Sequence, residues 1–276
     1  MTNPELHQAP LGKETHYPDQ YDPTLLFPIP RSGGRSQLSL QPHPQWYGAD
    51  IWNAYELSWL NPKGKPQVAM ARFTFEAVAP NIIESKSFKL YLNSFNQTRL
   101  DSTESLLARL QQDLSAASGA PVSIQLIEPA GFARQAIEDL DGTLLDELDI
   151  APSQYEPDAS LLQCRPETIV QETLVSNLLK SNCPVTRQPD WGSLQIRYEG
   201  PAIDHVSLLE YIISYRNHDS FHEQCVEQVF CDIIKQCQPV KLFVYARYTR
   251  RGGLDINPWR STFPVTSLPA ARQARQ

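Results

Sequence analysis

The 276-residue sequence contains no long apolar run and no excess of positive charge. A membrane-spanning helix needs about 18 uninterrupted apolar residues, and no window approaches that length, so we expect no membrane span. Lysine and arginine total 24 against 31 aspartates and glutamates, which gives a net charge of -7. Direct binding to nucleic acid is therefore not expected, because it normally needs a broad basic surface.

The first 20 residues also lack a basic stretch followed by an apolar run. We therefore expect no secretory signal and a cytoplasmic location. In that compartment the five cysteines are expected to be reduced thiols rather than a disulfide framework.

The common nucleotide and metal motifs are missing as well. No GxGxxG lies between a strand and a helix and no GxxxxGK[ST] occurs, so any dinucleotide must be held without a Rossmann or P-loop site. His222 and Cys225, spaced i and i+3 on a predicted helix, keep a zinc site open as a minor alternative. Because no CxxC pair or HExxH element accompanies them, no metal is expected.

The chain is long enough for one large domain or for two of about 140 residues. Its first 48 residues hold eight prolines, which favours an extended arm around a body that begins near Asp50. Between Glu138 and Asp158 there are eight carboxylates and no lysine or arginine, which is typical of a solvated connector. We therefore predict an arm over 1–48, a first unit over 49–137, an acidic connector over 138–160 and a second unit over 161–276.

The same order of elements occurs on both sides of the connector. In the first half, residues 55–76 alternate around the turn signal at 61–64 and predict a hairpin. Two helices and a strand over 121–129 follow, and the second helix is predicted to begin at Asp101 with a capping box. The apolar stripes of the two helices are Phe88, Tyr91, Leu92 and Phe95, then Leu106, Leu107, Leu110 and Leu114.

In the second half, residues 173–186 and 193–200 are predicted strands, and residues 240–249 form a closing strand. The two helices between them carry the stripes Val206, Leu209, Ile213 and Tyr215, then Phe221, Cys225, Val229, Phe230, Ile233, Ile234 and Cys237. We therefore predict an α+β protein of two tandem ββααββ units, each an antiparallel sheet with two helices on one face.

One cysteine differs in setting from the other four. Cys183 follows an apolar strand and precedes a polar turn, so its side chain is expected at a strand end, where it can face a cleft. Cys225 and Cys237 lie on an apolar helix stripe, where a thiol behaves as a small hydrophobe, and no motif surrounds Cys164 or Cys231. A nucleophilic and a structural role for Cys183 both stay open, because reactivity requires an environment that favours the thiolate.

Three acidic or titratable residues are candidates beside Cys183. Asp190 lies seven residues further on, across a turn, where it can donate a proton or simply form the turn. His222 and Glu223 lie in the first turn of a predicted helix, outside its apolar stripe. Capping alone also explains Glu223, because Ser220 with Glu223 fits a capping box and a carboxylate complements the helix dipole.

Two further segments have the composition of anion sites. Residues 84–89 place two lysines and two serines at a helix start, which suits a phosphate or merely a charged helix end. Residues 247–253 form the most basic run, with Arg247, Arg250, Arg251, Gly252 and Gly253. A solvated loop is the alternative for this run.

The segment Glu84-Ser-Lys-Ser-Phe-Lys-Leu-Tyr91 resembles the signature of the NADPH-dependent 7-cyano-7-deazaguanine reductases, the nitrile reductases of tRNA queuosine biosynthesis. Three more segments, LLKSNCPVTRQPDWGS, FHEQCVE and YARYTRRGGLDINPWRS, resemble the long, two-unit form of that family. The resemblance implies the tunnelling fold, in which ββααββ units assemble side by side, and agrees with the repeat.

The resemblance also implies roles for individual residues. Cys183 would attack the nitrile carbon and form a thioimide, Asp190 would donate a proton, and two hydride transfers would then give the amine. The residues implied to bind the deazaguanine substrate are Ile83, Glu84, Ser85, His222 and Glu223. Those implied to bind NADPH are Ser85, Lys86, Arg251 and Gly252. A homodimer is implied, with active sites at unit or subunit junctions.

Other functions would use the same residues differently. A zinc-dependent cyclohydrolase of the same fold group would use cysteine and histidine as ligands, and a cysteine-dependent hydrolase would pair Cys183 with His222 as its base. A purine-binding module without catalysis would leave Cys183 as ordinary packing. None of the three needs NADPH, so consumption of NADPH distinguishes them from a reductase.

Overall fold

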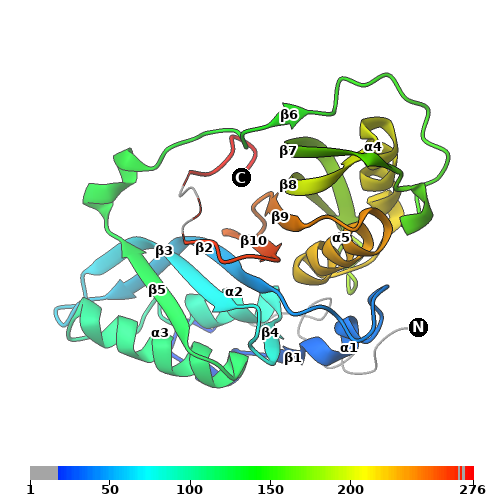
Figure 1. Cartoon of the computed structure of the whole chain (residues 1–276). Helices are drawn as coiled ribbons and strands as arrows, with labels where there is room; N and C mark the ends of the chain where they lie inside the picture. Colours follow the sequence, from blue (N-terminus) through cyan, green and yellow to red (C-terminus); the bar gives the residue numbers. More distant parts are fainter. Residues whose placement is uncertain (1–17, 267, 269–270) are drawn as a thin grey trace. The chain divides into compact units, whose positions relative to one another are not determined.

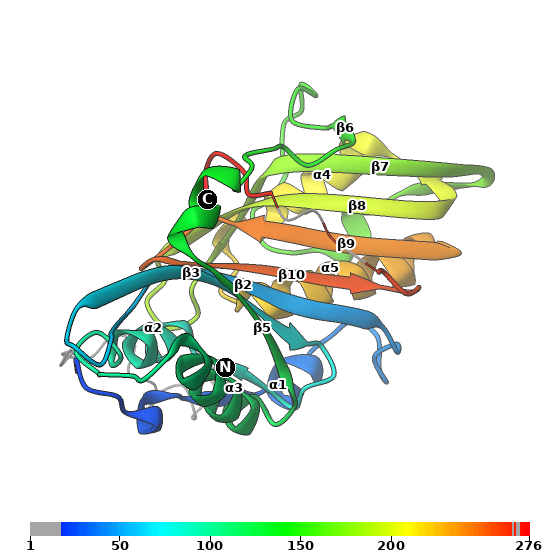
Figure 2. The ribbon, with the colours of Figure 1, turned by 90° about the vertical axis from the view of Figure 1, so that its left-hand side faces the viewer.

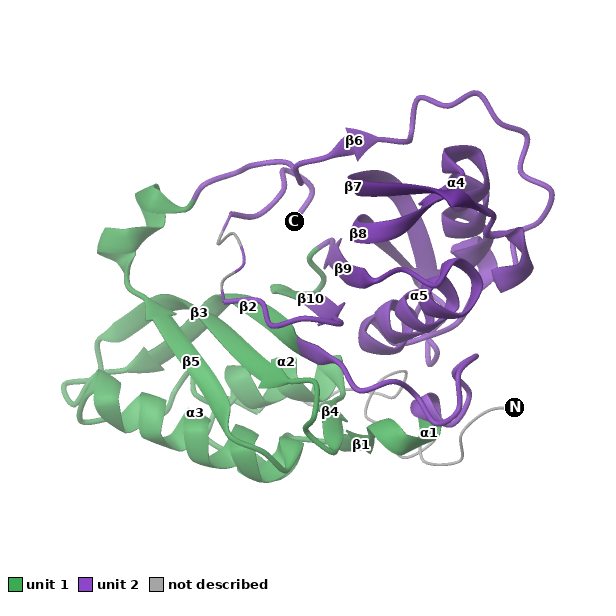
Figure 3. Cartoon of the chain, viewed as in Figure 1, with its two compact units in different colours: residues 1–33, 49–135, 250–256 green, residues 34–48, 136–249, 257–276 purple. Residues whose placement is uncertain are grey.

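The computed structural model describes residues 18–266, 268 and 271–276, with helices and strands as labelled in Figure 1. The described chain divides into two compact units, shown in Figure 3. The first unit holds the described residues up to Gly33 together with 49–135 and 250–256, and the second holds 34–48, 136–249 and 257 onward. Residues 1–17 of the predicted arm lie outside the described residues.

The first unit is a strand pair, a helix pair and a returning strand. Strand β3 lies between β2 and β5 and pairs antiparallel with both, and both helices lie on one face of this sheet (Figure 1). A separate ladder joins β1 (Pro28–Pro30) to β4 (Asn81–Ile83). The main elements are β2 (Tyr47–Leu60), β3 (Pro66–Glu76), α2 (Ser85–Asn93), α3 (Thr103–Ser118) and β5 (Val122–Ile127).

The helices of the first unit pack on the sheet through the predicted apolar stripes. All the α2 stripe residues are buried, as are those of α3 except Leu107, which is half-buried. The rings of Phe88 and Phe73 meet edge to face with centroids 5.1 Å apart, a favourable aromatic geometry. Helix α3 begins at Thr103 rather than Asp101, because the Ser102 hydroxyl accepts the Ser105 N–H (3.2 Å) as the N-cap.

The second unit repeats this order and adds a final strand. Strand β7 pairs with β8, β8 with β9 and β9 with β10, each time antiparallel. Helices α4 and α5, which lie between β8 and β9 in the chain, share one face of this sheet (Figure 2). Its elements are β7 (Cys164–Asn182), β8 (Pro189–Ile203), α4 (His205–Ser214), α5 (His222–Cys237), β9 (Lys241–Tyr248) and the part of β10 (Leu254–Ser261) from Asn257 onward. The predicted α+β fold of tandem units with antiparallel sheets and paired helices is confirmed.

The first strand of each unit contains a β-bulge at an equivalent place. The register with the next strand shifts by one residue between Ala54 and Leu57 in β2, and between Ser176 and Leu179 in β7. A bulge inserts one extra residue into one strand. The alternation of buried side chains therefore changes from even to odd numbers in both strands.

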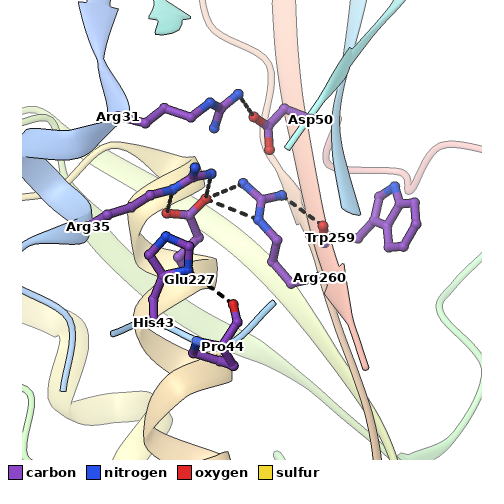
Figure 4. A network of polar contacts seen from close by, with 8 residues as sticks. All are labelled: Arg31, Arg35, His43, Pro44, Asp50, Glu227, Trp259 and Arg260. Atoms are coloured by element: carbon purple, nitrogen blue, oxygen red, sulfur yellow. Dashed lines mark hydrogen bonds and ion pairs between the residues drawn. The ribbon is translucent and has the colours of Figure 1, made fainter. Parts of the chain in front are cut away.

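The prediction of a wholly extended arm is wrong, because Arg31–Arg35 forms helix α1. No proline interrupts this stretch, and carboxylates hold its two arginines. Arg31 pairs with Asp50 (2.5 Å) within the first unit. In the second unit, Arg35 and Arg260 both pair with Glu227 of α5, with Nη2–Oε1 distances of 2.8 and 2.7 Å (Figure 4).

The acidic connector is only partly solvated, contrary to the prediction. Leu140 and Leu145 are buried, and β6 (Thr143–Leu144) runs parallel to β7. The Asp146 carboxylate accepts the Ser176 hydroxyl (2.6 Å) and the Asn177 N–H (2.9 Å). These bonds satisfy polar groups at the β7 bulge, so part of the acidic run stabilises the sheet.

Two other predictions for the second unit need correction. In the predicted α4 stripe Leu209 and Tyr215 are buried, but Val206 is 45% exposed and Ile213 is only half-buried. The helix also buries Leu208, Tyr211 and Ile212, which the stripe did not include. Strand β10 was not predicted at all. Finally, no helix in the described ranges is both long and apolar enough to cross a membrane.

Candidate functional site

Cys183 follows β7 in the tight turn that leads into β8. Its N–H donates to the Gln188 carbonyl (2.9 Å), and its own carbonyl accepts the Arg187 N–H (2.9 Å). Arg187 adopts the left-handed backbone conformation (φ 57°) that such a turn needs. The turn thus fixes the backbone of Cys183, whose side chain is 3% exposed.

Asp190 lies near the start of β8, opposite Ser181 of β7. Residues that face each other in an antiparallel pair lie on the same side of the sheet, and so do residues two apart in a strand. Ser181 and Asp190 are both buried. The predicted pairing of the two strands therefore brings Asp190 to the end of the hairpin that carries Cys183.

His222, the first residue of α5, contacts Asp190. Its Nε2 atom lies 3.2 Å from Asp190 Oδ2, and both side chains are largely buried. The imidazole stacks on the ring of Tyr248 from β9, with centroids 3.8 Å apart and an interplanar angle of 11°. The sequence indicated neither contact, because the three residues lie in different elements far apart in the chain.

The capping box predicted for Ser220 and Glu223 is wrong. The N-cap of α5 is Phe221, which makes no side-chain capping bond, and the Ser220 hydroxyl instead donates to the Phe221 carbonyl (3.2 Å). Glu223 is 3% exposed. A buried carboxylate is costly unless it is paired or hydrogen-bonded, so the burial of Glu223 distinguishes it from an exposed capping glutamate.

In the first unit, Glu84 is the N-cap of α2. Its two carboxylate oxygens accept the N–H groups of Lys86 and Ser87, each at 2.8 Å. Burial raises the pKa of the Glu84 carboxyl above its ordinary value, although these two bonds oppose the shift. Ile83, the last residue of β4, is buried beside it, and Ser85 and Lys86 open the helix.

The turn 250–253 also belongs to the first unit and rests on the β2 bulge. The Arg250 guanidinium lies over the Tyr55 ring (4.7 Å), and the Tyr55 N–H donates to the Gly253 carbonyl (3.0 Å). A Cβ at Gly253 would lie 2.5 Å from the carboxyl carbon of Glu56. The exposed Glu56 side chain can move away from such a Cβ, so the backbone decides the preference: the φ of 78° at Gly253 is one that glycine adopts freely.

The charged face of α2 lies against this turn. Lys89 of α2 forms an ion pair with Glu56, and a Cβ at Gly252 would be 4.0 Å from the Lys89 side chain. Lys86 lies three residues earlier, on the same face of the helix. The Ser85 hydroxyl and the cationic side chains of Lys86 and Arg251 therefore lie in one unit, and these side chains suit an anionic cofactor.

The residues proposed for a zinc site do not form one. Cys225 is fully buried, and burial raises the pKa of its thiol to about 12, which opposes the thiolate that zinc binds. Among the described residues, no three His, Cys, Asp or Glu side chains are grouped as metal ligands. The geometry gives the zinc alternative no support.

Comparison with known proteins identifies the class to which this chain belongs. A family model described as nitrile reductase, 7-cyano-7-deazaguanine-reductase N-term matches residues 17–126, and one described as QueF-like protein matches residues 189–264. A solved structure described as archaeosine synthase QueF-Like in the apo form aligns over 35% of this chain and 95% of that chain, with 16% identity and a TM-score of 0.31.

Curated relatives narrow this class to one family. The NADPH-dependent 7-cyano-7-deazaguanine reductase of Bordetella pertussis is 58% identical over 271 residues, which cover 98% of this chain and 99% of the relative. The protein of that name from Burkholderia lata is 60% identical over 275 residues, which cover 99% and 100%. The chain belongs to the NADPH-dependent 7-cyano-7-deazaguanine reductase family.

The candidate residues fall into two groups. Within the second unit, Cys183 and Asp190 share one hairpin, and His222 and Glu223 begin α5. The first unit contains Ile83, Glu84, Ser85, Lys86, Arg251 and Gly252. Tyr248 was not predicted as a site residue. The alternation of side chains along β9 places it on the same side as Val244 and Ala246, and this pattern could have predicted its burial.

Proposed function

We propose that this chain reduces the nitrile of 7-cyano-7-deazaguanine to the aminomethyl group with NADPH, as an enzyme of queuosine biosynthesis. The observation that carries the proposal is the position of Cys183, fixed at the end of a hairpin that also carries Asp190 in contact with His222. A nitrile accepts hydride poorly, and a covalent thioimide formed with acid assistance accepts it far better.

In this mechanism the Cys183 sulfur attacks the nitrile carbon, and the carbon–nitrogen triple bond becomes a double bond. The nitrogen takes a proton from Asp190, and the contact with His222 keeps the Asp190 carboxyl in place for that transfer. NADPH, when bound, would supply the two hydrides, and the carbon–sulfur bond breaks between the two reductions. Asp190, protonated again from solvent, gives the nitrogen its second proton, so the amine carries two added hydrides and two added protons. Cys183 leaves the carbon as a thiolate.

We assign substrate recognition to Ile83, Glu84, Ser85, His222 and Glu223. Carboxylates such as Glu84 and Glu223 suit the N–H edge of a guanine-like ring, because buried donors need acceptors. The pKa of Glu84 is raised by burial, so a bound N–H group would replace part of the solvation that the carboxylate has lost. We assign NADPH binding to Ser85, Lys86, Arg251 and Gly252.

The proposal is tested by adding 7-cyano-7-deazaguanine to protein and NADPH and following the nicotinamide absorbance together with product mass. We expect two NADPH oxidised for each amine formed. Formation of a hydrolysed purine-like product without NADPH oxidation would instead support the cyclohydrolase or the cysteine-dependent hydrolase.

Asp190→Asn is expected to lower kcat by about 10²- to 10⁴-fold, because an amide cannot supply the proton that the nitrile nitrogen needs. The substituted side chain has the same shape, so nitrile binding should change little. Steady-state kinetics and calorimetric binding of the nitrile measure the two effects. Asp149→Asn, which changes an exposed aspartate of the same unit, is the control, and near-normal turnover of Asp190→Asn would contradict the assignment of Asp190 as the proton donor.

Arg251→Ala is expected to raise the KM for NADPH roughly 10- to 100-fold, since a charge-assisted hydrogen bond to phosphate contributes about 1.5–3 kcal/mol. The kcat at saturating NADPH should change much less. Lys63→Ala removes an exposed cation from the same unit and should leave the KM unchanged. An unaltered KM in Arg251→Ala would contradict the assigned cofactor residues.

We further propose a cytoplasmic homodimer. Within the first unit β5 pairs with β3 on one side, and an open strand edge tends to pair with another chain unless it is covered. Closed two-fold assembly is the commonest way to bury such surfaces.

A further inference from the structure

Tyr248 is the aromatic residue on which the proposed active-site histidine rests. Its side chain is fully buried at the end of β9, and its ring lies nearly parallel to the His222 imidazole, with an interplanar angle of 11°. All residues of this arrangement belong to the second unit. The stack is therefore a feature of one compact unit.

The neighbouring strand has a glycine where the Tyr248 ring packs against it. Gly192 of β8 is the register partner of Tyr248, and a Cβ at Gly192 would lie 3.2 Å from Tyr248 Cδ1 and 3.3 Å from Cε1. Such contacts are tighter than normal packing, so a side chain at 192 would push the Tyr248 ring. Gly192 lies two residues after Asp190. One short stretch of β8 therefore contains both the proposed proton donor and the glycine against which the Tyr248 ring packs.

Little else holds the His222 ring in its orientation. Its Nδ1 atom is buried and has no hydrogen-bond partner among the residues that the structure describes. Helix α5 begins at His222 without a side-chain cap. The Asp190 contact through Nε2 and the face of Tyr248 are therefore the interactions that define the imidazole plane.

The Tyr248 hydroxyl has no comparable task. It lies beside Cys225 and Ser181 and makes no hydrogen bond of good geometry within the described ranges. Burial raises the pKa of Tyr248 well above its ordinary value, so the phenol does not exchange a proton near neutral pH. His222 therefore contacts the ring face of Tyr248 and not its hydroxyl.

We propose that Tyr248 is a positioning residue, whose ring holds the His222 imidazole in the plane that keeps Nε2 against Asp190. This inference rests on the proposed function. Tyr248 acts through His222 and does not itself touch the reacting atoms. Gly192 is required in this arrangement because a larger residue there would displace the Tyr248 ring.

Tyr248→Phe and Tyr248→Leu test the proposal, because phenylalanine keeps the ring face and leucine removes it. We expect Tyr248→Leu to lower kcat about 10- to 100-fold, since small displacements of catalytic groups have effects of that order, and Tyr248→Phe to retain most of the activity. Histidine-selective NMR supplies a second readout. The His222 ring protons, shifted upfield by the stack, should keep their shift in Tyr248→Phe and lose it in Tyr248→Leu.

Two further variants separate positioning from general stability. Tyr198→Leu removes a different buried tyrosine, which lies in the neighbouring strand β8. This change should lower the melting temperature but leave the His222 signals and kcat unchanged. Gly192→Ala keeps Tyr248 but displaces its ring, so it should lower kcat and shift the same His222 signals, even if Tyr248→Leu does not fold. Unchanged His222 signals and kcat in Tyr248→Leu or Gly192→Ala would overturn the proposal, whereas failure of the unsubstituted protein to reduce the nitrile would overturn the proposed function instead.

Discussion

Cys183→Ala is expected to abolish nitrile reduction, because the thiol supplies the only bond that converts the nitrile into a good hydride acceptor. The same substitution should abolish covalent capture. When the unsubstituted protein is mixed with 7-cyano-7-deazaguanine in the absence of NADPH, the reaction has no hydride source and stops at the thioimide. Intact-protein mass spectrometry should then show an increase of one substrate mass, and Cys183→Ala should show none.

Cys164→Ala is the matched control for this experiment. Cys164 is a free, half-buried thiol of the same unit, so its loss should leave both adduct and turnover intact. An adduct that persists in Cys183→Ala, or that maps to a peptide containing Cys225, would refute the assignment of the nucleophile. Nucleophilic attack by Cys225 is not expected, because burial raises the pKa of its thiol to about 12.

Glu227→Ala is expected to lower the free energy of unfolding of the second unit by about 3–5 kcal/mol. Glu227 is buried at 2% exposure and accepts bonds from the guanidinium groups of Arg35 and Arg260. Arg260 is itself 0% exposed. Removal of the carboxylate leaves two positive charges close together in the interior (Figure 4), which costs far more than the loss of a surface ion pair.

Arg35→Ala separates charge balance from packing. Because Arg35 is 14% exposed and its removal leaves Glu227 paired with Arg260, it should cost less than Glu227→Ala. Thermal unfolding measures both, with a shift of roughly 10 °C expected for Glu227→Ala and a smaller one for Arg35→Ala. Glu210→Ala, on the less buried surface of α4, is the control, and equal effects of Glu227→Ala and Glu210→Ala would contradict the charge argument.

The sequence predicted most of the regular structure because the apolar period of helices and strands is a local property. The stripe with Phe88 and Tyr91 shows this best, since four apolar residues at helical spacing left a single possible face. For α4 the predicted stripe was only partly right, because its apolar residues include the adjacent pairs Leu208–Leu209 and Ile212–Ile213, and such pairs leave the phase of the buried face open. Strand β10 was missed since Pro258 lies within it, and proline normally argues against a strand.

Only those site residues that belong to a local sequence pattern could be predicted. The strand-end position of Cys183 and its pairing with Asp190 followed from the hairpin, and residue types suggested anion sites at Lys86 and Arg251. The stack of His222 on Tyr248 depends instead on contacts between a helix and a strand distant in sequence. Such contacts depend on the packed tertiary structure, and a single sequence does not contain a local signal for them.

The β7 bulge has a consequence for insertions and deletions. Upstream of the bulge the even-numbered side chains at 174 and 176 are buried, and downstream the odd-numbered ones at 179 and 181 are buried, followed by Cys183. The bulge keeps Ser176 and Leu179, which are three residues apart, on one face, opposite Leu194 and Gly192. Deletion of one residue at 177–178 would therefore give a regular strand with the same faces, whereas one residue inserted at 180–181 without a second bulge would exchange the faces beyond it. The Cys183 thiol would then turn toward the opposite side of the sheet from Asp190, and we expect such an insertion to abolish activity.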